Sequence, residues 1–405
     1  MKKVIAVLLS LLLVCGCFAA AAGAADPENR VPADATRPED AHVSFGEDGK
    51  LTILQVADTQ DNAVLSTLVK RSLRLVIEKT KPDLIVLTGD NIGGYSCKTK
   101  VLAASAIRQY MDIFEKYGIP VAQVFGNHDD QDTKLTKEMQ FEVYEEYKCF
   151  IGCVGVTAEK TVGDNTMKNV GTYNIPIYES KESDKVAFNV WMFDSGTYNP
   201  DDEYGGYGYV LPEQMDWYVE KSNELKVANG GELVPSIAFQ HIVPPQIKDA
   251  LLETDENDEE AVGFAGSYYK LPEEVDRETN WLSEAPCPPN TDFEPGYLQV
   301  DTMLEQGDVL GVFFGHDHIN AYCVDYQGID LVSSPGQTYA SYNDDHRGYR
   351  TVTLDINDLT TYETATYTNL ELFEEDPIAS FLQKFVSLWD RISNFFEDLF
   401  SKFSL

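Results

Sequence analysis

Short apolar runs alternate with longer amphipathic segments over the first part of the chain. Strands are predicted at 51–57, 83–87 and 120–125, and helices near 63–79, 101–117 and 134–148. The apolar runs are continuous, which is typical of strands that are buried on both faces in a parallel sheet. The alternation of strand and helix therefore predicts an α/β arrangement.

The pattern changes after residue 170. Two apolar segments flank a charged turn and predict an antiparallel hairpin, which is followed by further alternation. The predicted elements are strands at 171–178 and 186–193, a helix near 212–226, a strand at 234–240, a helix at 297–306, a strand at 309–314 and β-rich segments to about residue 368. Residues 245–295 contain an acidic run and form a long connection, which in a compact domain is usually functional. Because this connection directly follows His241, we expect it to cover a site there.

The N-terminal residues predict export. A basic start, an apolar run over 4–14 and the small-residue triplet Ala22-Gly23-Ala24 are typical of a secretory signal peptide over residues 1–25. The segment Val14-Cys15-Gly16-Cys17 also resembles a lipoprotein signal, so lipid anchoring at Cys17 is an alternative. We therefore expect a secreted or cell-envelope protein, in which a polar linker over 26–45 leads to a main domain over 46–370.

Residues 371–405 predict an amphipathic C-terminal helix. Asp376 is suited to cap it, and Pro377 to occupy its first position. Apolar residues then recur at steps of four and three, at Ile378, Leu382, Phe385, Trp389, Ile392, Phe396, Leu399 and Phe403. Three interpretations remain open: docking on the chain's own domain, self-association, or contact with a membrane surface through 378–405.

Composition narrows the partners. An apolar content of 43% is ordinary for a folded protein. A net charge of −36 repels phosphate backbones, so nucleic acid is excluded as the main partner. Five cysteines follow the predicted cleavage site, and an odd number leaves at least one free thiol. Cys149 and Cys153 are near enough in sequence to pair, although packing roles explain them equally well.

Metal-ligand residue types follow five of the predicted strands. Four of the six histidines lie there, which packing alone does not readily explain. The residues are Asp58, Gln60, Asp90, Asn127, His128, Asp129, His241, His316 and His318. Strand ends that meet at one edge would bring these groups into a single metal site. A mixed set of imidazole, carboxylate and amide ligands suits Mn, Fe or Zn rather than Ca.

Asp90 follows Gly89, where the missing side chain permits close approach, so its carboxylate is suited to bridge two divalent ions. Such a pair clamps a phosphoryl group and lowers the pKa of a bound water, so that metal-bound hydroxide attacks. His128 is suited to protonate the leaving oxygen, and we expect Asp129 to orient its ring.

These motifs carry a family resemblance. Asp58-x-Gln60, Gly89-Asp90-Asn91, Gly126-Asn127-His128-Asp129, His241 and Gly315-His316-Asp317-His318 resemble the five blocks of calcineurin-like metallophosphoesterases, over residues 50–355. Further segments, among them Phe193-Asp-Ser-Gly196 and Gly206-Tyr-Gly208, resemble the purple-acid-phosphatase-like branch. The resemblance implies an α/β (α+β) fold in which a two-sheet sandwich is flanked by helices.

The resemblance also implies a division of the ligands. One metal would be held by Asp58, position 60, Asp90 and His318; the other would be held by Asp90, Asn127, His241 and His316, with His128 as general acid. Gln60 departs from the family pattern, because most members have histidine there and an amide oxygen is a weaker ligand. Manganese-dependent ADP-ribose/CDP-alcohol diphosphatases also resemble D-x-Q at this block, which keeps a nucleotide-linked diphosphate substrate open.

Three functions follow for comparison: a phosphate-ester hydrolase acting on a phosphorylated small molecule, a phosphodiesterase or diphosphatase for nucleotide-type substrates, and a non-catalytic metal-binding surface module. Two secondary sets of residues are weaker candidates for substrate contact. Tyr198, Tyr204, Tyr207 and Tyr209 either face the substrate or pack within their Gly-rich loop. His346 and Arg347 are more typical of a solvated pair than of a phosphate site.

Overall fold

The computed structural model describes residues 42–201, 206–264, 266–289 and 299–388. The predicted signal peptide, Cys17 and the C-terminal residues beyond 388 lie outside these ranges. Within them, no helix is both long enough and apolar enough to cross a membrane.

Two β-sheets form the centre of the molecule. The five-stranded sheet has the order β15 (Asp358–Thr368), β14 (Gly348–Asp355), β1 (Lys50–Val56), β2 (Leu84–Thr88) and β3 (Val121–Val124). The seven-stranded sheet has the order β12 (Tyr322–Tyr326), β13 (Ile329–Ser333), β11 (Val309–Phe314), β7 (Ser236–Phe239), β6 (Val186–Met192), β5 (Asn165–Tyr178) and β4 (Val156–Val162). Strands β1 to β3 run parallel to one another, as do β6, β7, β11 and β13. The predicted two-sheet sandwich is therefore confirmed.

The central strands are continuously apolar because both of their faces are covered, whereas the edge strands β4 and β15 are polar and partly exposed. In β1, Leu51 and Ile53 point into the core between the two sheets. Leu54 and Val56 point the other way, into a second core beneath the helices. This alternation between two buried faces explains why the sequence shows no polar face.

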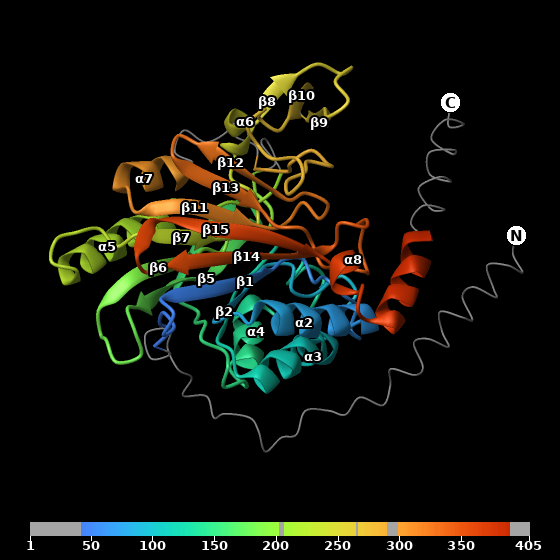
Figure 1. The fold of residues 1–405 in the computed structure, drawn as a ribbon, viewed down its shortest axis with the longest axis horizontal. Helices are drawn as coiled ribbons and strands as arrows, with labels where there is room; N and C mark the ends of the chain where they lie inside the picture. The colour runs from blue at the N-terminus through green and yellow to red at the C-terminus, as the bar shows by residue number, and fades with distance from the viewer. Residues whose placement is uncertain (1–41, 202–205, 265, 290–298, 389–405) are drawn as a thin grey trace, which may run out of the picture.

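Helices cover the outer face of each sheet (Figure 1). Helices α2 (Thr67–Thr80), α3 (Lys100–Tyr117) and α4 (Lys137–Tyr144) pack on the five-stranded sheet, and α5 (Pro212–Ala228) and α7 (Gln299–Gln306) pack on the other. Two helices begin later than predicted, because capping side chains fix their starts. Ser66 accepts a hydrogen bond from the Val69 N–H, and Thr136 accepts one from the Met139 N–H.

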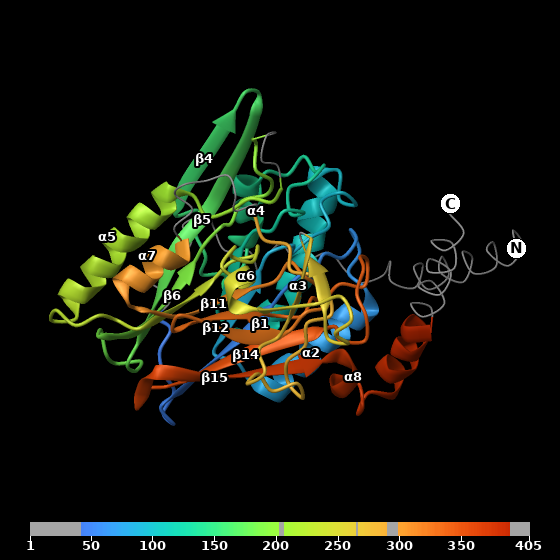
Figure 2. The same cartoon turned by 90° about the horizontal axis from the view of Figure 1, so that it is seen from above.

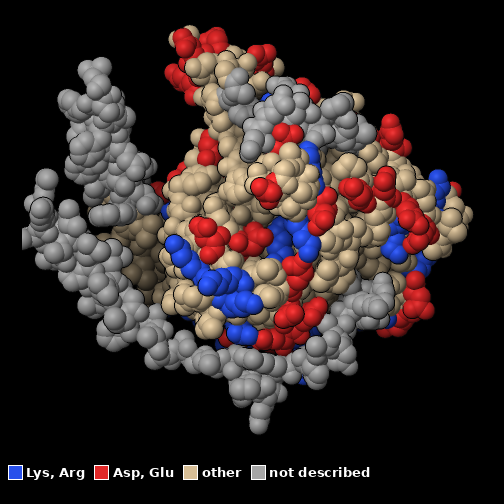
Figure 3. Space-filling model, turned by 180° about the vertical axis from the view of Figure 1, so that it is seen from behind, with Lys and Arg blue, Asp and Glu red and all other residues tan. Residues whose placement is uncertain are grey.

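Residues 245–289 form a projection and a return segment. The projection contains α6 (Ile247–Ala250), β8 (Leu252–Thr254), β9 (Val262–Phe264) and β10 (Ser267–Lys270) (Figure 1). Its acidic side chains gather at the tip (Figure 3). The return segment packs on the loop after β11, where the Trp281 N–H donates to Ala321 O at 2.7 Å. The Cys287 N–H donates to the Asp317 carboxylate at 3.2 Å. The return segment therefore adjoins the loop that carries His316 and His318, whereas the acidic run does not.

Other expectations for the chain ends are met in part. The end of the predicted linker belongs to the fold, because Val43 and Phe45 are buried and pair with Tyr178.

Figure 2 shows the β4–β5 hairpin extending from the far edge of the seven-stranded sheet. Cys149 and Cys153 are not joined by a disulfide bond, and no disulfide links any two of the five cysteines in the described ranges.

The C-terminal helix docks on the domain along one face. Its described part spans 377–388 and begins as predicted, because Asp376 accepts hydrogen bonds from the Ile378 and Ala379 N–H groups. Ala379, Leu382 and Val386 pack on the core beneath α2 and α3. A second apolar face remains 56–60% exposed, and its members are Ile378, Phe381, Phe385 and Leu388. Self-association and membrane contact through 378–405 stay predictions.

A buried ion pair anchors α4 to the end of β6. Lys137 Nζ lies 2.7 Å from Asp194 Oδ2, and both side chains are almost inaccessible to solvent. The same carboxylate accepts hydrogen bonds from the Val170 and Gly196 N–H groups. Next to it, the Ser195 hydroxyl oxygen accepts from the Ile242 N–H at 2.9 Å. The pair thus fixes the loop that holds the backbone beside His241.

Lys137→Met should lower the free energy of unfolding by about 3 to 5 kcal/mol, because the Asp194 carboxylate would stay buried without its counter-charge. Lys168→Met is the matched control, since Lys168 pairs with Glu138 at the surface and exposed pairs contribute about 0 to 1 kcal/mol. Denaturant unfolding measures both variants. Equal, small losses in the two would contradict the anchoring role.

Candidate metal centre

The candidate site lies where parallel strands of both sheets end. Asp58, Asp90 and Asn127 follow β1, β2 and β3, while His241 and His316 follow β7 and β11. Because parallel strands release their carboxyl ends at the same edge, each sheet delivers its residues to one place. The packing of the two sheets then brings the two sets face to face.

Four predicted ligands have left-handed backbone conformations. Their φ angles are 50° at Asp58, 34° at Gln60, 47° at Asp90 and 74° at His316. Non-glycine residues rarely adopt this region, and such strain concentrates at functional sites. Backbone hydrogen bonds hold the turns, since the Asp58 N–H donates to Gly89 O and the Gln60 N–H donates to Asp90 O.

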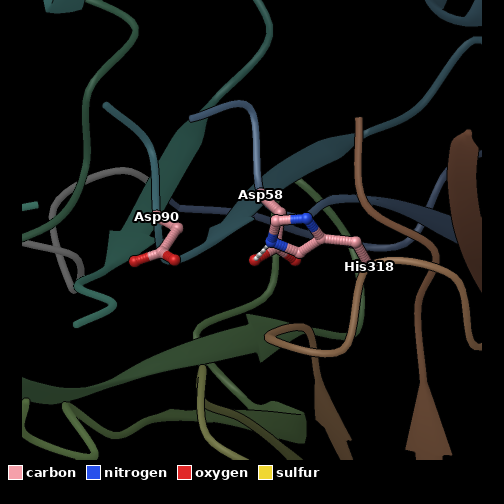
Figure 4. Close-up of side chains that lie close together, drawn as sticks. All are labelled: Asp58, Asp90 and His318. Carbon is pink, nitrogen blue, oxygen red and sulfur yellow. Dashed lines mark ion pairs between the residues drawn. The ribbon is translucent and has the colours of Figure 1, made fainter. Parts of the chain in front are cut away.

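One group of ligand atoms gathers at Asp58, Asp90 and His318, where all lie within 4.8 Å of one another (Figure 4). His318 Nε2 is 3.5 Å from Asp58 Oδ1. Gln60 reaches the same place, with Nε2 3.5 Å from Asp90 Oδ2, while its buried Oε1 has no hydrogen-bond partner among the described residues. Rotation of the amide would present that oxygen to a cation.

A second group gathers at His241 Nε2. This nitrogen is 3.2 Å from Asn127 Oδ1, 3.4 Å from Asp90 Oδ2 and 3.3 Å from His316 Nδ1. Asp90 therefore contacts both groups, as a bridging carboxylate would. The seven predicted metal ligands all belong to one or the other group.

Hydrogen bonds outside the site set the direction of these ligands. His241 Nδ1 donates to Thr88 O at 2.9 Å, and His318 Nδ1 donates to Tyr342 O at 2.8 Å. Each bond leaves Nε2 directed at the carboxylates, as in histidines that bind metals. The Asn127 amide nitrogen donates to the Tyr198 hydroxyl at 3.3 Å, so its oxygen faces His241.

The buried carboxylates of the site favour positive charge on the groups beside them. Burial alone would lower the pKa of His241, but the Asp90 carboxylate outweighs it and raises that pKa to about 10. The same contact holds the pKa of Asp90 below its usual range, against the cost of burial. Two carboxylates and several buried lone pairs converge here, and no lysine or arginine of the described residues forms an ion pair with them. Divalent cations would satisfy this donor set, so the residues fit a metal centre.

Three glycines make room for the ligands. A Cβ added at Gly89 would lie 2.6 Å from the His241 side chain, and one at Gly315 would lie 2.5 Å from Asp58 Oδ2. A Cβ at Gly126 would lie 2.2 Å from Asp90 Oδ1. Any side chain at these positions would displace a ligand.

The prediction that Asp129 orients the His128 ring is wrong. His128 Nδ1 hydrogen-bonds the side-chain oxygen of Gln131, not Asp129. Asp129 is fully buried and accepts hydrogen bonds from the Gly126 N–H at 2.7 Å and the Ile92 N–H at 3.0 Å. The turn leaves these backbone donors without partners, and the carboxylate satisfies them. Asp129 thus joins the loop after β3 to the loop after β2, while half-buried His128 contacts Gln131 and Tyr95.

The secondary candidates separate into two sets. Tyr198 and Tyr207 contact site residues, whereas Tyr209 packs on Ala158 and Met167 of the β4–β5 hairpin and hydrogen-bonds Lys160. Tyr204 lies outside the described residues. Arg347 is not solvated as predicted, because it is buried and donates to Thr338 O at 2.8 Å. His346 stacks on Trp281, away from the site residues.

The sequence pattern did not single out Tyr342, whose ring stacks on His318 with centroids 4.3 Å apart. It also missed Thr88, Ser195 and Gln131 as supports. Of these, only Gln131 had a sequence signal, because it lies three residues after His128 in a turn.

Gly126→Ala is expected to displace Asp90 and to reduce bound Mn²⁺, measured by atomic emission after equilibration, from about two ions per chain to one or none. Gly118→Ala is the control. It introduces the same methyl group at a positive φ with nothing within 4 Å, so it adds strain without touching a ligand. Undiminished metal in Gly126→Ala would contradict the site.

Curated relatives match most of the chain. "Probable inactive purple acid phosphatase 14" of Arabidopsis thaliana is 26% identical over 316 residues, which cover 75% of this chain and 70% of the relative. "Probable inactive purple acid phosphatase 29" of the same plant is 27% identical, covering 81% and 82%. "Phosphatase DCR2" of Saccharomyces cerevisiae is 26% identical, covering 71% of this chain and 48% of the relative.

The family model for the calcineurin-like phosphoesterases matches residues 51–320. This range contains both sheets' central strands and all nine predicted site residues. The order of the strands, the positions of the ligands and this match agree, and the chain belongs to the calcineurin-like phosphoesterase family.

Proposed function

We propose that the protein is an exported, metal-dependent hydrolase of phosphate esters with a binuclear centre. One observation carries the proposal: the Asp90 carboxylate contacts two separate groups of ligand atoms, one around His318 and one around His241. Membership of the family and the relative named as a phosphatase support the class of reaction. The N-terminal signal pattern supports export.

The ligands divide between two cations. Asp58, Gln60, Asp90 and His318 would hold one, while Asp90, Asn127, His241 and His316 would hold the other. Divalent cations in these positions supply a nucleophilic water of lowered pKa and positive charge for the phosphoryl oxygens. The mixed nitrogen and oxygen donors suit Mn, Fe or Zn as these cations.

His128 provides the proton for the leaving oxygen. Its backbone N–H donates to Asp90 Oδ1 at 2.7 Å, which ties the residue to the centre. Its ring is half-buried and held through Nδ1 by Gln131, so Nε2 is available to a substrate. A neutral amide orients the ring without the added basicity that a carboxylate would give.

His128→Ala should lower kcat for phenyl phosphate about 10²- to 10⁴-fold while bound Mn²⁺ is unchanged. The loss should be smaller for p-nitrophenyl phosphate, since that leaving oxygen departs readily without a proton. Steady-state kinetics on both esters gives the two losses. Equal losses on the two esters would rule out the proton-donor role.

A second function, a non-catalytic metal-binding module, is favoured by Gln60 and by the word "inactive" in the names of the plant relatives.

Gln60→His should bind the more weakly held of the two Mn²⁺ ions more tightly than the wild type does, because imidazole is the stronger ligand. Gln60→Leu should bind that ion less tightly. Isothermal titration after chelation measures each. A wild-type chain that holds well under two ions and hydrolyses no ester would favour the module.

A further inference from the structure

We propose that the substrates are phosphodiesters that carry an aryl or nucleobase group, held by stacking on Tyr198 and Tyr342 beside the candidate metal centre. This rests on the proposed function and adds the substrate class to it. The organic group, rather than charge alone, would then supply much of the binding.

Four tyrosines surround the centre, and each contacts a different site residue. The Tyr95 ring lies edge-on to His128 at 5.5 Å, and the Tyr207 ring lies edge-on to His316 at 4.3 Å. Tyr198 hydrogen-bonds Asn127, and Tyr342 lies parallel to the His318 ring. They come from three separate loops, so the fold gathers aromatic rings at this place.

Two of these rings are exposed to solvent beside the buried ligands. The seven predicted ligands are buried, and His128 is half-buried. Tyr198 is 42% exposed and Tyr342 is 53% exposed. Exposed ring surface next to buried catalytic groups is what a planar substituent would cover, because stacking on aromatic side chains accepts many ring types.

Among the described residues, no basic side chain adds to the attraction of the centre for a dianionic substrate. In the described ranges, no lysine or arginine forms a hydrogen bond or ion pair with any of the nine predicted site residues. Lys137 is occupied by Asp194, and Arg347 donates to backbone carbonyls. An acidic residue, Glu284, lies beside Tyr342 instead, because it accepts a hydrogen bond from the Tyr342 hydroxyl at 3.1 Å.

A phosphate monoester carries up to two negative charges at neutral pH, whereas a diester carries one. A site with cations but no basic side chain, on a chain of net charge −36, gains less from the second charge. A diester therefore loses less electrostatic binding here and offers a second ester group for the rings.

The hydroxyl and the ring of Tyr198 have separable roles. The hydroxyl orients the Asn127 amide, and the ring stacks on Tyr207 at 5.7 Å. Tyr198→Phe removes only the hydroxyl, whereas Tyr198→Leu also removes the ring. Tyr342→Leu leaves the carbonyl that accepts from His318, so the ligand keeps its backbone partner.

The test compares three esters with one leaving group: p-nitrophenyl phosphate, methyl p-nitrophenyl phosphate and phenyl p-nitrophenyl phosphate. The two diesters have equal charge and differ only in methyl against phenyl. On the Mn²⁺-loaded full chain, kcat/KM should be about tenfold higher for the phenyl diester than for the methyl diester, and lowest for the monoester.

In Tyr198→Leu and Tyr342→Leu, the phenyl-to-methyl ratio should fall toward one, mainly through KM. It should persist in Tyr198→Phe and in Tyr268→Leu, a control on β10. Equilibrium dialysis with phenyl methylphosphonate, which lacks the nitrophenolate leaving group, should show weaker binding to both tyrosine-to-leucine variants at the site. Circular dichroism establishes that each variant is folded.

The outcomes separate the two proposals. Equal turnover of both diesters by the wild type, or an unchanged ratio in both site variants, overturns the stacking proposal and leaves the hydrolase intact. Failure to hydrolyse all three esters overturns the proposed function instead. In that case the dialysis still decides, because binding of phenyl methylphosphonate that ignores Tyr198 and Tyr342 overturns the stacking proposal.

Discussion

One carboxylate, Asp90, connects the two groups of candidate ligand atoms in this molecule. Its Oδ1 accepts from the His128 N–H, while its Oδ2 lies between Gln60 and His241. Each contact comes from a different loop. The carboxylate can contact both ligand groups only if β1, β2 and β3 of one sheet and β7 of the other all end at the same place.

That register is maintained by features with no direct part in the chemistry. Asp90 has a left-handed backbone conformation. A side chain added at Gly89 would collide with His241, and one added at Gly126 would collide with Asp90. Asp129 joins the loops after β2 and β3 through their backbone N–H groups. Strained backbone and buried acids cost stability locally, and the two large apolar cores offset that cost.

The directions of two candidate histidine ligands do not depend on the residue at position 60. The backbone carbonyls of Thr88 and Tyr342 direct His241 and His318, and backbone acceptors do not depend on side-chain identity at those positions. A change such as glutamine at position 60 alters one donor while the remaining ligands keep their directions. The site is therefore better described by its geometry than by its motif alone.

The sequence by itself indicated the central strands, the long helices and the candidate ligands at the strand ends, because continuous apolar runs and turn residues are local signals. It did not indicate β4 or the short elements α6 and β8 to β10. It also indicated that Asp58, Asp90 and four histidines belong together. Only the tertiary structure decided what each side chain contacts: Gln131 rather than Asp129 for His128, a buried Arg347, and Tyr342 against His318. These contacts join segments far apart in the chain or depend on which way a turn directs consecutive side chains, and neither leaves a periodic trace in the sequence.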